Sequence, residues 1–353
     1  MRLKRYITLF CLIVFSKTIT AQIITTVSGV PGIPGYSIDG YLAIYSATAG
    51  PTGILKLPGG NLLIAEERSQ YIRIITPAGR MATLAGNGTQ GETGDGGPAI
   101  NATMDSPYQL AVDNAGNIYF LDVSGNAIRK ITPAGIMMHV AGLVNEAGNL
   151  GYSGDGGPVD QALFGHMTDI CCDNANNLYI SDDRSCIVRK VNLSTGIIRT
   201  IVGDGYAGFS GDGGPATAAR LNSPSAITVD NAGNLYIADY GNKRIRKVTP
   251  AGIITTIAGT GIAGTTGDGG AATNAKVDNL FDLTVDNAGN LYTAGNNVVR
   301  KITVATGIIT RIGGTGVAGT SGDDGPATAA EISPTNLSFD SNGDLYIADN
   351  FNY

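Results

Sequence analysis

Short runs of apolar and β-branched residues alternate with turn residues along residues 224–259, and much of the chain repeats this pattern. Residues 225–230, 234–239, 244–248 and 253–258 each have the length and composition of a β-strand. Asn-Ala-Gly at 231–233 and Pro-Ala-Gly at 250–252 are hairpin connections, because Gly adopts the positive φ that such turns need. Asp230 can accept backbone hydrogen bonds across the first turn. The stretch therefore predicts a four-stranded antiparallel meander.

The strand–turn motif V-D-N-A-G-N recurs with small changes, and its Asp marks each copy. The Asp lies 54 to 60 residues from the next one, at Asp113, Asp173, Asp230, Asp286 and Asp340. A degenerate copy places Leu57 at the same position, so the chain holds six copies of a repeat of about 56 residues. A constant period of this length indicates a repeat architecture.

Four strands per repeat are typical of a β-propeller blade. The chain lacks the 3.6-residue periodicity of helical repeats, and it has no Trp, which argues against blades of the Trp-Asp type. Residues 235–238 are apolar or aromatic at successive positions, so both faces of the sheet should be covered by neighbouring sheets. The pattern predicts an all-β fold, a β-propeller of six blades with four antiparallel strands each.

The two ends of the chain indicate how the ring closes. Residues 23–28 (IITTVS) closely match residues 253–258 (IITTIA), so we expect this N-terminal strand to complete the last blade and close the ring. Only the first two strands of that blade precede Tyr353. We therefore expect a propeller domain over residues 22–353 whose last blade is incomplete because the domain is truncated at its C-terminal end.

Residues 1–21 have the features of a secretory signal peptide, with a basic start, an apolar core and Ala21 before the expected cleavage site. The apolar run is shorter than the roughly 20 residues that span a bilayer, so we do not expect a membrane-spanning chain. The predicted location is secreted or at the cell surface, with the periplasm as an alternative.

The charge of the chain argues against nucleic acid as a partner. The net charge of −6 becomes −10 without residues 1–21, which carry four basic and no acidic residues. Nucleic-acid affinity depends mainly on neutralising phosphates, and the basic patch that marks such domains is missing. We expect no nucleic-acid binding.

Two sequence motifs resemble a known family. The strands N-L-Y-I-A-D and N-x-R-I-R-K-V at 234–239 and 242–248 look like the NHL repeat. The linker G-D-G-G-P-A-T-A-A at 211–219 is similar to that of secreted bacterial NHL-repeat proteins and of the teneurin NHL region. The resemblance covers essentially residues 22–353 and implies a six-bladed propeller. It does not imply one activity, because relatives include binding platforms and a few enzymes.

Linkers of about 25 residues join successive blades, and loops of this length usually contain some order. Pro215 and the Ala-rich run that follows predict one or two turns of helix with Leu221 packed beneath. Each linker repeats a Gly-flanked Asp, at Asp95, Asp155, Asp212, Asp268 and Asp323. We interpret these residues as folding the turn and capping the helix, and the alternative is a set of calcium ligands. The doublet Asp323-Asp324 is the best calcium candidate, and no other cofactor is expected.

Acidic residues at the ends of second strands and arginines in third strands form another repeated set. The acids are Asp122, Asp182 and Asp239, and the arginines are Arg129, Arg189 and Arg246. We interpret them as a structural network that locks the second and third strands together. The alternative is a polar rim that faces a ligand.

Histidine and cysteine give weak signals. His139 and His166 belong to different strands, so they do not supply the clustered ligands that a zinc enzyme needs. His166 alone stays a candidate site residue. Cys171 and Cys186 could form a disulfide in an exported chain, and the alternative is that the cysteines are unpaired, buried and hydrophobic.

Two function hypotheses follow. The first is a monomeric, non-enzymatic binding module that meets a protein or glycan through the linker loops, with Tyr152, Tyr206 and Phe209 as anchors. The alternative is a calcium-dependent hydrolase or lyase of the lactonase-like type, with Asp169 and Asp282 near the central channel. No nucleophile-elbow or phosphate-binding motif is present, which favours the binding module.

Overall fold

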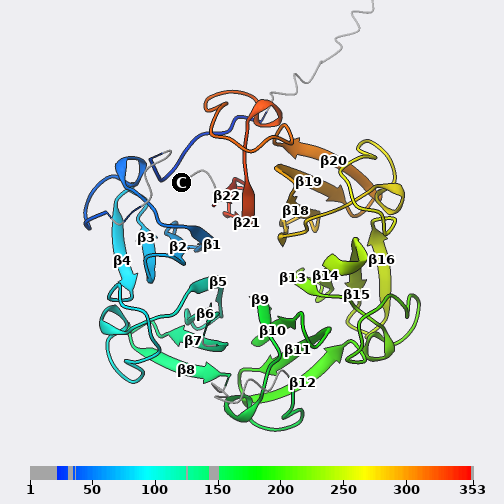
Figure 1. The fold of residues 1–353 in the computed structure, drawn as a ribbon, viewed down its shortest axis with the longest axis horizontal. Coiled ribbons are helices and arrows are strands. Elements are labelled where there is room, and N and C mark those ends of the chain that lie inside the picture. The colour runs from blue at the N-terminus through cyan, green and yellow to red at the C-terminus, as the bar shows by residue number, and fades with distance from the viewer. Residues whose placement is uncertain (1–21, 31–34, 36, 125, 143–150, 351–353) are drawn as a thin grey trace, which may run out of the picture.

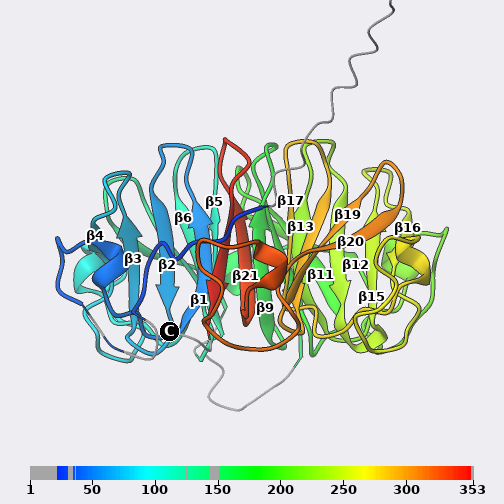
Figure 2. The ribbon, with the colours of Figure 1, turned by 90° about the horizontal axis from the view of Figure 1, so that it is seen from above.

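The structure is a computed structural model that describes residues 22–30, 35, 37–124, 126–142 and 151–350. Its strands form separate antiparallel sheets around a common axis, seen along that axis in Figure 1 and from the side in Figure 2. The predicted signal peptide lies outside the described residues. Within the described ranges, no helix is long and apolar enough to cross a bilayer.

Five sheets have four strands each, and a sixth has two. The first three sheets consist of β1 (Pro51–Lys56), β2 (Leu62–Glu66), β3 (Tyr71–Ile75) and β4 (Met81–Ala85); β5 (Pro107–Val112), β6 (Ile118–Asp122), β7 (Ala127–Ile131) and β8 (Met137–Ala141); and β9 (Met167–Cys172), β10 (Asn177–Asp182), β11 (Ile187–Asn192) and β12 (Ile197–Val202). The others consist of β13 (Pro224–Val229), β14 (Leu235–Asp239), β15 (Arg244–Val248) and β16 (Ile254–Ala258); β17 (Asp282–Val285), β18 (Leu291–Gly295), β19 (Val298–Thr303) and β20 (Ile308–Gly313); and β21 (Pro334–Phe339) and β22 (Leu345–Asp349).

The β13–β16 sheet is the meander expected from residues 224–259. Its strands pair antiparallel in chain order, and their bounds differ from the expected ones by at most one residue. Asp230 Oδ1 accepts hydrogen bonds from the amides of Ala232 and Asn234 at 3.0 and 2.8 Å, which confirms the predicted turn.

The propeller with four-stranded antiparallel blades is confirmed, but the predicted count of six such blades is wrong. The structure has five complete blades and the two-stranded β21–β22 sheet, because the arginine-bearing third strand occurs only five times up to residue 350. The N-terminal segment adds no strand to β21–β22. Ile24 instead exchanges backbone hydrogen bonds with Asp324 and Gly325 of the last linker, and Figure 1 shows this blue segment beside the orange linker.

The first strands of the sheets contact one another in a closed cycle around the axis. Side chains at one equivalent position tie these strands together. Asp169 Oδ2 accepts from Ile227 N at 2.6 Å, and Asp282 Oδ2 accepts from Leu337 N at 2.7 Å. Asn336 Oδ1 accepts from Ile54 N at 2.8 Å. These bonds satisfy buried polar groups and link neighbouring sheets near the axis.

The hydrophobic core is divided among the spaces between neighbouring sheets. One cluster joins Tyr179 and Val188 to Ile227 and Ile237, which come from two consecutive blades. Another joins Ile64 of β2 to Ala348 of β22, so the two-stranded sheet also packs on the first blade. Residues 235–238 are all buried, as the successive apolar positions predict, because a blade is covered on both faces.

In the described residues the linkers contain single turns of 3₁₀ helix, at the short end of the one or two turns expected. These turns are η1 (Ala43–Tyr45), η2 (Ala99–Asn101), η3 (Val159–Gln161), η4 (Ala216–Ala218), η6 (Ala272–Asn274) and η7 (Ala327–Ala329), and η5 (Tyr240–Asn242) lies in a hairpin. Leu221 is fully buried after η4, as predicted. Pro215 forms a bridge with Ile253 beside β16, so the linker covers part of an outer sheet edge.

We predict that Gly53→Ala destabilises the fold by about 1–3 kcal/mol, because a Cβ there would lie 2.5 Å from the carbonyl oxygen of Tyr108 on the next inner strand. Gly59→Ala is the matched control, since a Cβ at Gly59 meets nothing within 4 Å. Urea unfolding of both variants measures the difference. Equal midpoints would contradict the tight contact between β1 and β5.

Candidate functional site

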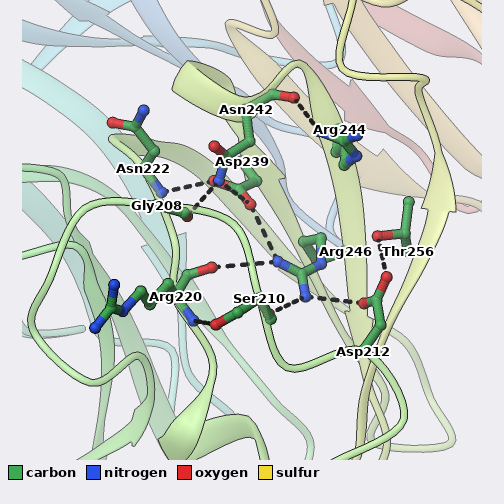
Figure 3. Close-up of polar contacts among 10 residues, drawn as sticks. All are labelled: Gly208, Ser210, Asp212, Arg220, Asn222, Asp239, Asn242, Arg244, Arg246 and Thr256. Carbon is green, nitrogen blue, oxygen red and sulfur yellow. Dashed lines mark hydrogen bonds and ion pairs between the residues drawn. The ribbon is translucent and has the colours of Figure 1, made fainter.

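The linker between β12 and β13 is held by the guanidinium of Arg246, which extends from β15 (Figure 3). Arg246 is fully buried and donates to Asp239 Oδ2 at 3.2 Å and to Asp212 Oδ1 at 2.8 Å. It also donates to the carbonyl oxygens of Ser210 and Arg220 at 3.0 and 3.4 Å. One buried cation therefore connects a second strand, a third strand and two points of the linker, an arrangement we call the arginine clamp.

The linker contacts of the arginine clamp recur in every complete blade, whereas an ion pair to a second-strand acid is seen for Arg129 and Arg246. In each of these blades, the arginine donates to the linker Asp and to the carbonyl oxygen of the residue two positions before that Asp. The arginine–Asp pairs are Arg73–Asp39, Arg129–Asp95, Arg189–Asp155, Arg246–Asp212 and Arg300–Asp268. The predicted capping role of these aspartates is wrong, because the 3₁₀ turns have no side-chain cap. Thr256 Oγ1 donates to the second oxygen of Asp212 instead.

Two members of the clamp differ from what the sequence suggested. The sequence pattern does not mark Asp39 as a linker acid, because it lacks the Gly immediately before and the Gly two residues after that the other linker acids share; the Asp-Gly pair before η1 is its sequence signal. Asp182 accepts from the amides of Gly165, His166 and Ser185, and the described residues show no ion pair between it and Arg189.

Aromatic side chains lie over the clamp on the solvent side. Phe209 is 43% exposed, and the guanidinium carbons of Arg244 and Arg246 lie 3.9 and 4.9 Å from its ring centroid. Tyr206 is 68% exposed, with the Arg220 guanidinium 5.7 Å from its ring centroid. Tyr152, from the preceding linker, is 37% exposed and its hydroxyl lies against Gly205. We call Tyr152, Tyr206 and Phe209 the aromatic linker surface.

Burial changes the pKa of the strand-end acids. Burial raises the pKa of Asp122 to about 6, although Arg129 and a backbone amide oppose the shift, and it also raises the pKa of Asp239. Glu66 occupies the same position in the first blade, and burial raises its pKa to about 7. Its Oε2 accepts from Ser69 at 2.7 Å, and its Oε1 has no partner among the described residues.

The two acids predicted near the central channel, Asp169 and Asp282, lie on the innermost strands of their sheets, β9 and β17. Asp169 and Asp282 are both 3% exposed, and burial raises the pKa of each. The charge of Asp169 further raises the pKa of Asp282. Backbone amides bind oxygens of both groups, which gives each a structural role between blades.

The remaining candidates lie apart from one another. His166 Nδ1 lies 2.9 Å from Asp183 Oδ1, and His139 is exposed on β8. The three described cysteines are free, so the possible disulfide does not form. Asp323 Oδ2 accepts from Thr26, and the amide of Asp324 donates to Ile24 O. In the described part of the chain, no group of three or more His, Cys, Asp or Glu residues could hold a metal ion.

Comparisons with known proteins support the repeat type. The model of the teneurin NHL domain matches residues 61–150 and 205–266. Teneurin-1 of Gallus gallus is 30% identical over 247 residues, which are 63% of this chain and 8% of that protein. The chain thus spans a small part of this relative. Its repeats are similar to those of the teneurin NHL region, as the motifs indicated.

Solved structures support the fold. A protein of unknown function from Bacteroides thetaiotaomicron has a TM-score of 0.65 at 17% identity, with 93% of this chain and 73% of that chain covered. A gluconolactonase from Xanthomonas campestris has a TM-score of 0.54 at 13% identity, with 86% and 84% covered. Identities this low show the shared propeller alone.

We predict that Arg246→Lys lowers the free energy of unfolding by about 3 kcal/mol, because an ammonium cannot reach both carboxylates and both carbonyls of the clamp. Amide exchange of residues 204–222 should accelerate as the linker is released. Arg199→Lys is the control, since Arg199 is exposed on β12. Unchanged exchange in the linker would contradict the clamp.

We predict that Glu66→Gln reduces the loss of stability between about pH 5 and pH 8. The folded pKa of about 7 exceeds the ordinary value of 4.5, so in this range the folded chain holds a proton that the unfolded chain has released. Stability due to this group therefore falls as the pH rises. Thermal unfolding across the range measures the slope. The neighbouring half-buried Glu67, changed to Gln, is the control; an unaltered slope in Glu66→Gln would refute the assignment.

Proposed function

We propose that this chain is an exported, non-enzymatic binding module that meets a protein or glycan through the aromatic linker surface. The observation that carries the proposal is the exposure of Tyr152, Tyr206 and Phe209 on linkers whose backbones are fixed by buried arginines. Aromatic side chains on a rigid support lose little conformational entropy on binding and are enriched at interface centres. The similarity to the teneurin NHL region supports an interaction role.

The chemistry of this surface is consistent with the proposed ligand classes. Arg220 and Asp204 form a partly exposed ion pair at 3.1 Å beside Tyr206, so hydrogen-bonding groups flank the aromatic rings. The protein acts outside the membrane core as a secreted or cell-surface monomer and does not bind nucleic acid, since its acidic charge would repel phosphates.

The second candidate function is a calcium-dependent hydrolase or lyase. The observation that favours it is the presence of two buried carboxyls, Asp169 and Asp282, on the innermost strands β9 and β17. Asp323 and Asp324 are its proposed calcium ligands. It ranks second because backbone amides already bind both channel carboxyls. A lactone turnover assay with and without calcium separates this candidate from the binding module.

We predict that Tyr206→Ala weakens ligand binding about tenfold or more, because truncating a central aromatic anchor commonly costs more than 1 kcal/mol. Binding is measured with the purified chain on an array of polysaccharides and extracellular proteins. Ile262→Ala is the matched control, because Ile262 holds the equivalent position in the next linker and is 56% exposed. Equal losses in both variants, or none in Tyr206→Ala, would exclude the aromatic linker surface.

A further inference from the structure

Two rings of the aromatic linker surface occupy the same repeat position. Tyr152 and Phe209 each lie three residues before the Asp of their linker. The guanidinium carbon of Arg189 lies 5.9 Å from the ring centroid of Tyr152. The guanidinium carbon of Arg246 lies 4.9 Å from the ring centroid of Phe209. The surface therefore repeats one ring, supported by a clamp arginine, on two consecutive linkers.

Tyr206 joins these two rings into one band. A Cβ added at Gly205 would lie 3.1 Å from the hydroxyl oxygen of Tyr152, so Tyr152 lies beside the residue that precedes Tyr206. Phe209 follows three residues later in the same linker. A band of rings that crosses two linkers matches a ligand built of repeated ring units. A chain of sugars is such a ligand, because the C–H faces of its rings pack on aromatic faces.

The exposed area of the band favours a glycan over a protein. Tyr152, Tyr206 and Phe209 are 37%, 68% and 43% exposed. Aromatic side chains have roughly 150–250 Å² each, so the three rings together expose about 300 Å². A stable protein partner commonly covers about 800 Å² on each side. The band is therefore large enough for a short run of sugar units and too small by itself for a protein interface.

An ion pair beside the band can bind hydroxyl groups. Arg220 Nε donates to Asp204 Oδ2 at 3.1 Å, and the two side chains are 51% and 28% exposed. Within the described part of the chain, the Nη atoms of Arg220 have no hydrogen-bond partner, and Figure 3 shows this guanidinium directed away from Arg246. Asp204 has lone pairs beyond those that bind Arg220 and the amide of Tyr206. Sugar hydroxyls both donate and accept hydrogen bonds, so this pair fits them.

The charge around the band argues against a polyanion. The carboxylates of Asp155, Asp204 and Asp212 are each in an ion pair with an arginine. These charges cancel locally, while the chain without residues 1–21 carries a net charge of −10. A chain of this sign repels polyanions at long range. The favoured ligand is therefore a neutral glycan.

We propose that the aromatic linker surface binds a neutral polysaccharide. Its sugar rings stack on Tyr152, Tyr206 and Phe209, and its hydroxyls form hydrogen bonds with Arg220 and Asp204. This inference rests on the proposed function and names the ligand class of the same surface.

The next linker, between β16 and β17, provides an internal comparison. It has neither the rings nor the ion pair at the positions equivalent to Asp204, Tyr206, Phe209 and Arg220, which are Thr260, Ile262, Thr265 and Lys276. Lys276→Gln therefore removes a positive charge at the equivalent position outside the proposed site. It is the matched control for Arg220→Gln.

The test is calorimetric titration of the purified chain with the neutral polysaccharides xyloglucan, galactomannan, mixed-linkage β-glucan and dextran. Polygalacturonate and a set of extracellular proteins are titrated for comparison. At least one neutral polysaccharide should bind saturably, with an affinity that stays constant between about 50 and 500 mM NaCl because no charge is neutralised. Arg220→Gln should weaken this binding about tenfold through loss of a charged hydrogen-bond donor, and Lys276→Gln should bind like the unchanged chain. Affinity should also rise with the length of oligosaccharides from that polymer, and Tyr152→Ala should remove the rise.

Four results would contradict the proposal. Binding of proteins alone, lost in Tyr206→Ala, would overturn this inference and leave the proposed function standing. Tighter binding of polygalacturonate, weakened by salt, would make the ligand a polyanion. Equal weakening by Arg220→Gln and Lys276→Gln would place the hydroxyl contacts elsewhere. If neither polysaccharides nor proteins bind, both the inference and the proposed function fail.

Discussion

A buried guanidinium in each complete blade is the interaction on which the ordered parts of this molecule depend. The side chains of Arg73, Arg129, Arg189, Arg246 and Arg300 are 0–3% exposed, and an unpaired charge so far from water would be strongly destabilising. Each is compensated by acceptors that lie far from it in sequence. The described parts of the long linkers are therefore held in place because they supply the carboxylates and carbonyl oxygens that these buried charges need.

The clamp also explains why exposed aromatic residues can belong to loops and yet be well placed. Phe209 lies against two guanidinium groups, one of them buried, so its ring is supported from below while its outer face meets solvent. Loops on a fixed scaffold are the usual place for recognition. In this blade the side chain of Arg246 connects β15 directly to the loop, through hydrogen bonds to Ser210 and Asp212.

Much of the fold could be predicted from sequence because the repeat imposes both local and long-range order. The turn at Asp230 and the burial of residues 235–238 follow from patterns of two to six residues. The partners of the clamp arginines could not be predicted from such short sequence patterns. The sequence predicts that Asp212 folds the turn and caps the helix next to it, whereas its partner Arg246 is 34 residues away and meets it only in the folded blade. The structure has five complete blades, and its last sheet is incomplete, as the sequence predicted; the N-terminal segment bonds to the last linker and does not extend that sheet.

The side-chain hydrogen bonds between the innermost strands differ from one repeat to the next, although the six repeats share the same sequence pattern. Asn336 Nδ2 donates to Gln109 Oε1 at 2.7 Å, and the residue at the same position of the strand between them is Gly53, which has no side chain to interrupt this contact. The next members, Asp169 and Asp282, flank a repeat that has Ala226 at this position. Exchanging two neighbouring repeats would therefore place two polar side chains next to each other on the inner strands.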